Sequence, residues 1–258
     1  MEWIKLSLLE CFKASDPKTG QVYYGHDQDW YKHWFKRLAG CGPTTGANIL
    51  LYNTLVGSLF DNPEKRMSYP LKSTTPAKPK SLGIAAANSP AGSPSDGPIS
   101  GDFPVVQDAS LQRMEIMWQY VRPAKRGGVY STEKFCEGIR NYCRSFGYGV
   151  VLESLDVPQV KSDRPSTAAT VDFISISLRQ NRAVAFLNLD NGSEKQLEKW
   201  HWVTIVGIYV KDNDVRLEIL DNCTIFQLDL NSWLKTTVRG GGFVRFYFMA
   251  GERISVAP

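Results

Sequence analysis

The residue best suited to nucleophilic chemistry in this sequence is Cys41, which stands between two glycines in the stretch RLAGCGPTTGANILLY. Pro43 fits the first position of a helix, where the missing N–H of proline is not needed. From Ala47 to Leu55 apolar residues recur at helical spacing, which predicts that one face of this helix is buried. The positive end of a helix stabilises a thiolate, and flanking glycines let backbone approach the sulfur. The alternative is a small buried cysteine without a chemical role.

A thiol nucleophile needs a base that takes its proton, and the base needs an acceptor that orients it. His201 begins HWVTIVGIYV (201–210), the strongest strand pattern in the chain. On a two-residue period its side chain shares a face with Val203, Ile205 and Tyr209. The sequence therefore favours His201 as the base. The alternative is a histidine that merely ends a strand.

Asp221 is the candidate acceptor for His201. In VRLEILDNC it falls in step with the apolar residues Val215, Leu217 and Ile219. A carboxylate on a buried face is costly unless it is paired or hydrogen-bonded, and an imidazole on the adjacent strand is a natural partner. Asp221 followed by asparagine is also typical of a turn, which is the alternative interpretation.

The turn between these two strands decides whether the pair can meet. The polar stretch KDND predicts a hairpin. If Lys211–Asp214 were a regular four-residue loop, Val210 would pair with Val215 and Asp221 would point away from His201. A loop of odd length, or a bulge near Gly207, would bring both side chains to one face. We therefore expect one of these irregularities.

A cysteine at a helix start, a histidine on a later strand and an aspartate on the next strand resemble the papain-like cysteine peptidases. More specifically, AGCGPTTGANIL, HWVTIVGI and LDN resemble the double-glycine-peptidase-like branch, which comprises the bacteriocin-processing peptidases and their soluble relatives. The resemblance implies a papain-like fold in which Cys41 is the nucleophile, His201 the general base and then acid, and Asp221 the orienting group. It extends over most of the chain.

In families of this kind an upstream glutamine builds the oxyanion hole together with the backbone N–H of the cysteine. The resemblance implies this role for Gln28, in GHDQDWYKHW. The family glutamine usually lies closer to the cysteine, so we expect an inserted turn, with the aromatic-rich stretch WYKHWF packed beneath the helix. A glutamine in a solvated turn is the alternative. His26 and His33 compete with His201 as base but have no patterned carboxylate on a neighbouring strand.

The function implied by the resemblance is that of a cysteine hydrolase, which cleaves a peptide or amide bond through a thioester. An acyltransferase or amidase with the same triad is one alternative, and a non-catalytic papain-fold interaction module is another. No metal and no organic cofactor is implied. The expected partner is a peptide or protein substrate. The Gly-Gly leader specificity of the bacteriocin-processing relatives is not carried over to this chain.

Composition sets limits on these functions. The 258 residues are 43% hydrophobic and 22% charged, enough for a single domain over 1–258 with a full core. The net charge of +4 comes from scattered basic residues, which argues against a nucleic-acid partner. No apolar run predicts a membrane span, and the N-terminus does not read as a secretory signal. Five cysteines without metal-ligand spacing predict free thiols in the cytoplasm.

The remaining patterns predict an α+β protein. Helices are expected over 109–121, 131–146 and about 170–181, and strands over 149–155, 183–189, 201–210, 215–221 and 243–249. Helices come first and an antiparallel sheet second. The segment 63–105 holds 8 of the 14 prolines and few large apolar residues, which predicts a flexible insertion.

Overall fold

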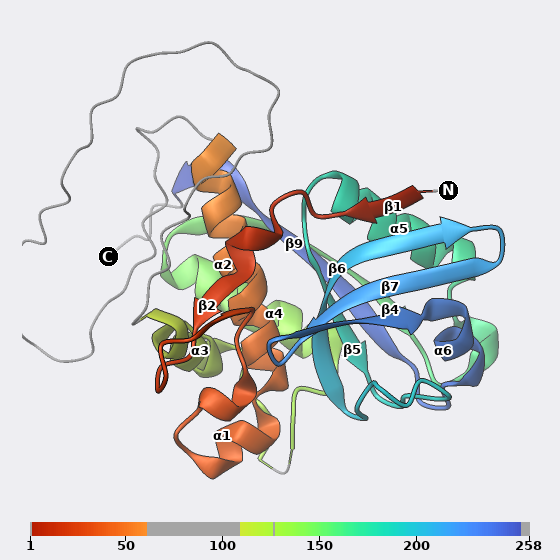
Figure 1. Ribbon diagram of the computed structural model, residues 1–258, viewed down its shortest axis with the longest axis horizontal. Coiled ribbons are helices and arrows are strands. Elements are labelled where there is room, and N and C mark those ends of the chain that lie inside the picture. Colours follow the sequence, from red (N-terminus) through yellow and green to blue (C-terminus); the bar gives the residue numbers. More distant parts are fainter. Residues whose placement is uncertain (1, 61–108, 126, 254–258) are drawn as a thin grey trace, which may run out of the picture.

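A seven-stranded antiparallel sheet forms one side of the molecule, and the helices between residues 34 and 145 gather at the other (Figure 1). The computed structural model describes residues 2–60, 109–125 and 127–253. The strand order is β4-β9-β5-β6-β7-β8, and β1 also pairs with β6. The α+β class is therefore confirmed. The strands of this sheet are β1 (Glu2–Lys5), β4 (Tyr148–Val157), β5 (Val184–Asn188), β6 (His201–Lys211), β7 (Asp214–Asp221), β8 (Thr224–Asp229) and β9 (Gly241–Arg253).

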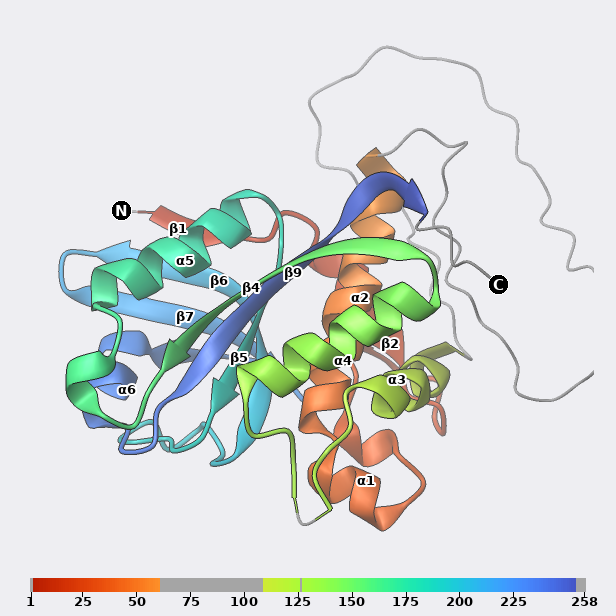
Figure 2. The same cartoon turned by 180° about the vertical axis from the view of Figure 1, so that it is seen from behind.

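Six α-helices accompany the sheet in the described ranges. The helix α5 lies across one face of the sheet, where Figure 2 shows it in front. The six helices are α1 (Trp34–Ala39), α2 (Cys41–Phe60), α3 (Ala109–Tyr120), α4 (Thr132–Ser145), α5 (Thr167–Arg179) and α6 (Leu230–Thr236). A small second sheet pairs β2 (Lys13–Ser15) with β3 (Val22–Tyr24).

The helix α2 is the central element of the helical side, where it packs against α3 and β6. Every residue from Cys41 to Tyr52 is buried, so the prediction of a single buried face is wrong for this half of the helix. The helix also begins at Cys41, two residues before Pro43. The reason is tertiary: this half of α2 is enclosed by other elements and does not lie on the surface.

Gly40 is the only residue between α1 and α2. A Cβ at this position would lie 2.3 Å from the Lys36 carbonyl oxygen and 2.7 Å from the Tyr31 ring. These distances are too short for any side chain. The glycine before Cys41 is therefore required by close packing, and it allows one helix to follow another almost without a break.

The later helices begin where serine caps them. The Ser131 hydroxyl accepts a hydrogen bond from the Lys134 N–H at 3.2 Å at the start of α4. The Ser166 hydroxyl accepts one from the Ala169 N–H at 3.1 Å at the start of α5. The helix expected from Thr170 therefore begins three residues earlier, at Thr167.

The order "helices first, sheet second" is wrong in one respect, because β1 joins the sheet from the N-terminus, antiparallel to β6. The elements α1, β1, β2, β3, β8 and α6 were not predicted from sequence. The insertion expected over 63–105 lies outside the described residues. The described elements share one hydrophobic core, in which the rings of Phe135 and Trp202 stack at 4.3 Å between centroids.

The pairing of β6 with β7 contains the expected irregularity. Val210 pairs with Val215, and the register then shifts between Ile205 and Gly207, so that Thr204 pairs with Leu220. The prediction of a bulge near Gly207 is confirmed. The shift also corrects one detail, since beyond it Ile208 and not Tyr209 continues the face of His201.

Candidate functional site

His201 and Asp221 meet at the end of the β6–β7 ladder. His201 is the first residue of β6 and Asp221 the last of β7. The His201 Nε2–H donates a hydrogen bond to the Asp221 Oδ1 at 2.8 Å, which confirms the predicted contact. The imidazole is almost fully buried, with 4% of its side chain exposed, against 15% for Asp221. The bond fixes the ring and leaves Nδ1 as the other nitrogen available to a partner.

Cys41 approaches this pair from the N-terminus of α2. Its thiol donates to the Trp200 carbonyl oxygen at 3.9 Å and lies close enough to His201 to affect the ring's pKa. Burial lowers the pKa of His201, but the hydrogen bond to Asp221, the interaction with Cys41 and the charges of both groups raise that pKa well above its ordinary value. The structure therefore brings together a thiol, an imidazole and a carboxylate, and the thiol and the carboxylate favour the protonated form of the imidazole.

A cavity of about 660 Å³ opens beside the Cys41 sulfur. Its lining combines the reactive side chains with apolar walls and two glycines. A substrate group in this cavity would lie next to both Cys41 and His201. The lining residues are Gln28, Leu38, Cys41, Gly127, Gly128, Tyr130, Glu198, Lys199, Trp200 and His201.

Gln28 lines the same cavity, on the short helical turn Gln28–Trp30. Its backbone N–H donates to the Asn222 side-chain oxygen at 3.2 Å. Its Oε1 is buried and has no hydrogen-bond partner within the described residues. An amide rotates to present either its oxygen or its NH2, so this side chain can offer a donor to a ligand. The inserted turn that we expected between Gln28 and Cys41 is helix α1. The aromatic stretch WYKHWF was expected to pack beneath α2, but its Trp34 is 62% exposed and does not.

His26, one competing base, is occupied elsewhere. It is fully buried, its Nδ1 lies 2.7 Å from the Asn48 side-chain oxygen, and its Nε2 accepts from the Arg113 Nε–H at 3.4 Å. Burial, and then the charge of Arg113, lower its pKa to about 3. His26 is therefore a neutral structural residue that ties three elements together.

His33, the other competing base, has a capping role. It precedes α1, and its Nδ1 accepts a hydrogen bond from the Phe35 N–H at 3.2 Å. A side chain used in this way closes the first turn of a helix. Among the three histidines, only His201 lines the cavity beside Cys41.

The other four cysteines differ from Cys41 in their surroundings. Burial raises the pKa of Cys11 and of Cys136 to about 11. It raises the pKa of Cys143 and of Cys223 to about 12. These thiols are therefore protonated near neutral pH, and a protonated thiol is a poor nucleophile.

Sequence reasoning missed the residues that shape the cavity. Trp200 has a left-handed backbone, with φ of 58°, which is uncommon for a bulky residue and directs its carbonyl toward the Cys41 sulfur. The Trp202 indole N–H donates to the Val129 carbonyl at 2.6 Å and so holds the wall that contains Tyr130. The sequence signal that could have revealed these residues is the tryptophan on each side of His201.

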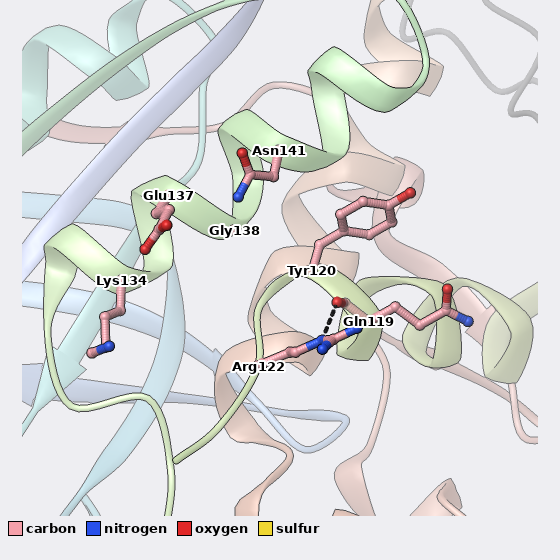
Figure 3. Close-up of a pocket in the computed structure, with 7 residues that line it drawn as sticks. All are labelled: Gln119, Tyr120, Arg122, Lys134, Glu137, Gly138 and Asn141. Atoms are coloured by element: carbon pink, nitrogen blue, oxygen red, sulfur yellow. Dashed lines mark hydrogen bonds between the residues drawn. The ribbon is translucent and has the colours of Figure 1, made fainter.

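A second hollow lies between α3 and α4, and Figure 3 shows the polar side chains at its edge. The Arg122 Nε–H there donates to the Gln119 carbonyl at 2.7 Å. Neither a cysteine nor a histidine lines this hollow. It therefore offers none of the groups that the Cys41 cavity combines.

Two further properties concern the described residues alone. None of their helices has both the length and the apolarity needed to cross a bilayer. No group of three or more histidine, cysteine, aspartate or glutamate side chains among them is arranged to hold a metal ion.

Comparison with known proteins leaves the site to be interpreted from its own geometry. No protein-family model matches the sequence, and no curated protein matches it.

Proposed function

We propose that this protein is a cysteine hydrolase that cleaves a peptide or amide bond through a Cys41–His201–Asp221 triad. One observation carries the proposal: the His201 ring joins the Asp221 carboxylate, 2.8 Å from Nε2, to the Cys41 thiol at the wall of an open cavity. Nucleophile, base and orienting group are thus connected in the order that thiol catalysis requires.

The reaction would begin from a thiolate and a protonated imidazole. The Cys41 sulfur attacks the carbonyl carbon, a C–S bond forms, and the carbonyl electron pair moves to oxygen. The backbone N–H of Cys41 and the Gln28 amide would hold this oxyanion. The C–N bond then breaks as His201 gives its proton to the leaving amine, and a thioester remains.

Water would complete the cycle. His201, now neutral, takes a proton from water as the oxygen attacks the thioester carbon. The second tetrahedral intermediate expels the Cys41 thiolate and releases a carboxylic acid. Asp221 accepts a hydrogen bond from the ring throughout, which favours the charged imidazole formed at each proton transfer.

We further propose that the fold is papain-like and belongs near the double-glycine peptidases. The order of the triad supports this: a cysteine at the start of the central helix, and a histidine and an aspartate on neighbouring antiparallel strands. Helix α1 between Gln28 and Cys41 is a departure from the family pattern.

The nucleophile is tested by limited alkylation with iodoacetamide near neutral pH, followed by peptide mapping. Cys41 is expected to react first, because the pKa of each of the other four thiols is raised to about 11 or 12. Preferential labelling of any other cysteine would contradict the assignment.

The activity is tested by incubation with a peptide library and analysis of the products by mass spectrometry. Cleavage is expected with the natural chain and with Cys136→Ala, which removes a buried thiol of α4, but not with Cys41→Ala. Cleavage that survives in Cys41→Ala would disprove the proposal. A reactive Cys41 without any cleavage would favour an acyltransferase.

A further inference from the structure

The loop Gly25–Gln28, which carries the candidate oxyanion donor, is attached on one side to the helix of Cys41 and on the other to the turn that follows Asp221. On one side the His26 N–H donates to the Asn48 side-chain oxygen at 2.7 Å. Asn48 belongs to α2, the helix that begins with Cys41. This bond therefore fixes the position of the loop along α2, and with it the position of the loop relative to Cys41.

On its other side the loop is attached to the tip of the β7–β8 hairpin. The Gln28 N–H donates to the Asn222 side-chain oxygen at 3.2 Å, and the Cys223 thiol donates to the Gly25 carbonyl at 3.5 Å. Asp221 pairs with Thr224, so Asn222 and Cys223 are the whole turn. The residue that anchors Gln28 thus directly follows the residue that orients His201.

The backbone of this turn is unusual at its second residue. Asn222 has φ of 38° and Cys223 has φ of 65°, both in the left-handed region. Two-residue hairpin turns of this kind favour asparagine at the first position and glycine at the second, so Asn222 fits the turn and Cys223 does not. Non-glycine residues in such a conformation persist where the surrounding structure holds them, often at functional sites. Here both side chains make contacts that glycine could not make.

We propose that Asn222 is a positioning residue that holds Gln28 against the reacting carbonyl oxygen. The inference rests on the proposed function. By accepting the Gln28 backbone N–H, Asn222 fixes the main chain and leaves the side-chain amide free for the cavity, where its Oε1 lacks a partner within the described residues. One turn then sets both the base and the oxyanion donor, through Asp221 and Asn222.

Two reactions of Cys41 separate this role from a merely structural one. Acylation by p-nitrophenyl acetate forms a C–S bond through a tetrahedral oxyanion and releases p-nitrophenolate. Alkylation by iodoacetamide forms a C–S bond by direct displacement of iodide and passes through no oxyanion. Asn222→Gly tolerates the left-handed backbone but removes the acceptor. Rates measured in Cys41→Ala are subtracted as background.

Asn222→Gly is expected to lower the acylation rate by about 10- to 100-fold, since misplacing a catalytic group costs on this order. The alkylation rate should stay within about twofold of the natural chain, because the thiol and the imidazole are unchanged. The matched control is Asp212→Gly, in the two-residue turn between β6 and β7, where φ is 51° and the side chain is exposed. It should change neither rate.

Gln28→Ala provides the second variant. If Asn222 acts through Gln28, the double variant should be no slower in acylation than Gln28→Ala alone. If the two substitutions together lower the acylation rate by the product of their separate effects, the proposal is overturned. An unchanged acylation rate in Asn222→Gly, or an equal fall in both rates, would also overturn it. A Cys41 that is not a catalytic nucleophile would look different, because the natural chain would then show no acylation above the Cys41→Ala background.

Discussion

At the scale of single residues, two buried histidines respond to protons in opposite ways. The Asp221 and Cys41 side chains favour the charged form of His201, and its pKa is raised even though burial lowers it. His26 is enclosed beside Arg113, and its pKa is lowered to about 3. Near neutral pH the surroundings therefore keep His26 neutral and favour the protonated form of His201.

Replacing Asp221 by asparagine is expected to lower kcat/KM by about 10² to 10⁴-fold. It should also move the alkaline limb of the pH profile to lower pH, because the hydrogen bond that raises the pKa of His201 is weakened. The measurement is a pH–rate profile of peptide cleavage. Asp214→Asn, at the exposed start of β7, is the control and should leave the profile unchanged. An unshifted profile in Asp221→Asn would count against the triad.

The same pKa shift has a consequence for stability. Because the pKa of His201 is higher in the folded state, the pairing contributes fully below about pH 6.5, and this contribution is lost as the pH rises through the raised pKa. Asp221→Asn should therefore show a weaker loss of unfolding free energy on the alkaline side. Urea unfolding at several pH values measures this difference.

His26 produces the opposite dependence. Its pKa is lower in the folded state, about 3, so the unfolded chain binds a proton that the folded chain excludes between pH 6.5 and about 3. As the pH is lowered through this window, the unfolding free energy should fall by about 1.4 kcal/mol per pH unit because of this one residue. His26→Gln, although less stable, should show a slope smaller by one proton. An identical slope in urea unfolding would show that His26 is not the group responsible.

At the scale of elements, the position of the Cys41 sulfur depends on how closely α1 joins α2. Gly40 is the only residue between them, and the Lys36 carbonyl lies where its Cβ would be. The first residues of α2 are buried beneath neighbouring elements and have no room to shift. Packing around Gly40 therefore determines where the Cys41 sulfur lies.

Gly40→Ala is expected to destabilise the protein by about 1–3 kcal/mol, because a new Cβ would overlap backbone in a packed region. It should also slow alkylation of Cys41. Gly128→Ala is the control: its Cβ would meet nothing closer than the Tyr130 ring at 3.7 Å. Thermal unfolding should separate the two variants clearly. Equal melting temperatures would show that the α1–α2 junction can shift to accommodate the new Cβ.

At the scale of the whole molecule, exposed apolar side chains gather around the Cys41 sulfur. Leu38, Tyr130 and Trp200 are 71%, 38% and 44% exposed, and all three line the Cys41 cavity. They come from three distant parts of the chain. The Tyr130 and Trp200 rings meet edge to face at 5.4 Å between centroids. Apolar walls of this kind favour substrates with large apolar side chains near the scissile bond.

Leu38→Ser and Tyr130→Ser are each expected to raise KM about 5- to 10-fold for peptides with apolar residues, since each removes about 1 kcal/mol of apolar contact. kcat should change little. Val160→Ser is the control, because Val160 is 57% exposed but lies outside the cavity. Steady-state kinetics on apolar and on acidic peptides measures the effect. Equal KM changes for both peptide classes would contradict an apolar subsite.

The sequence alone determined the features that depend on near neighbours along the chain. Glycine, cysteine and proline marked the start of α2, and apolar alternation placed Asp221 on the inner face of its strand. The same alternation required an irregularity in β6 if His201 and Asp221 were to meet, and the register shifts between Ile205 and Gly207. These predictions succeeded because local sterics and the two-residue strand period do not depend on distant contacts.

Only the tertiary structure decided what depends on residues far apart in the chain. The burial of α2 on all sides from Cys41 to Tyr52, the pairing of β1 with β6 and the apolar walls of the cavity have no local signature. The contact between Gln28 and Asn222 joins residues 194 positions apart. Such contacts arise where packing brings polar groups together that must then be satisfied. The sequence thus singled out Cys41, His201 and Asp221, and the fold decided which side chains surround and position them.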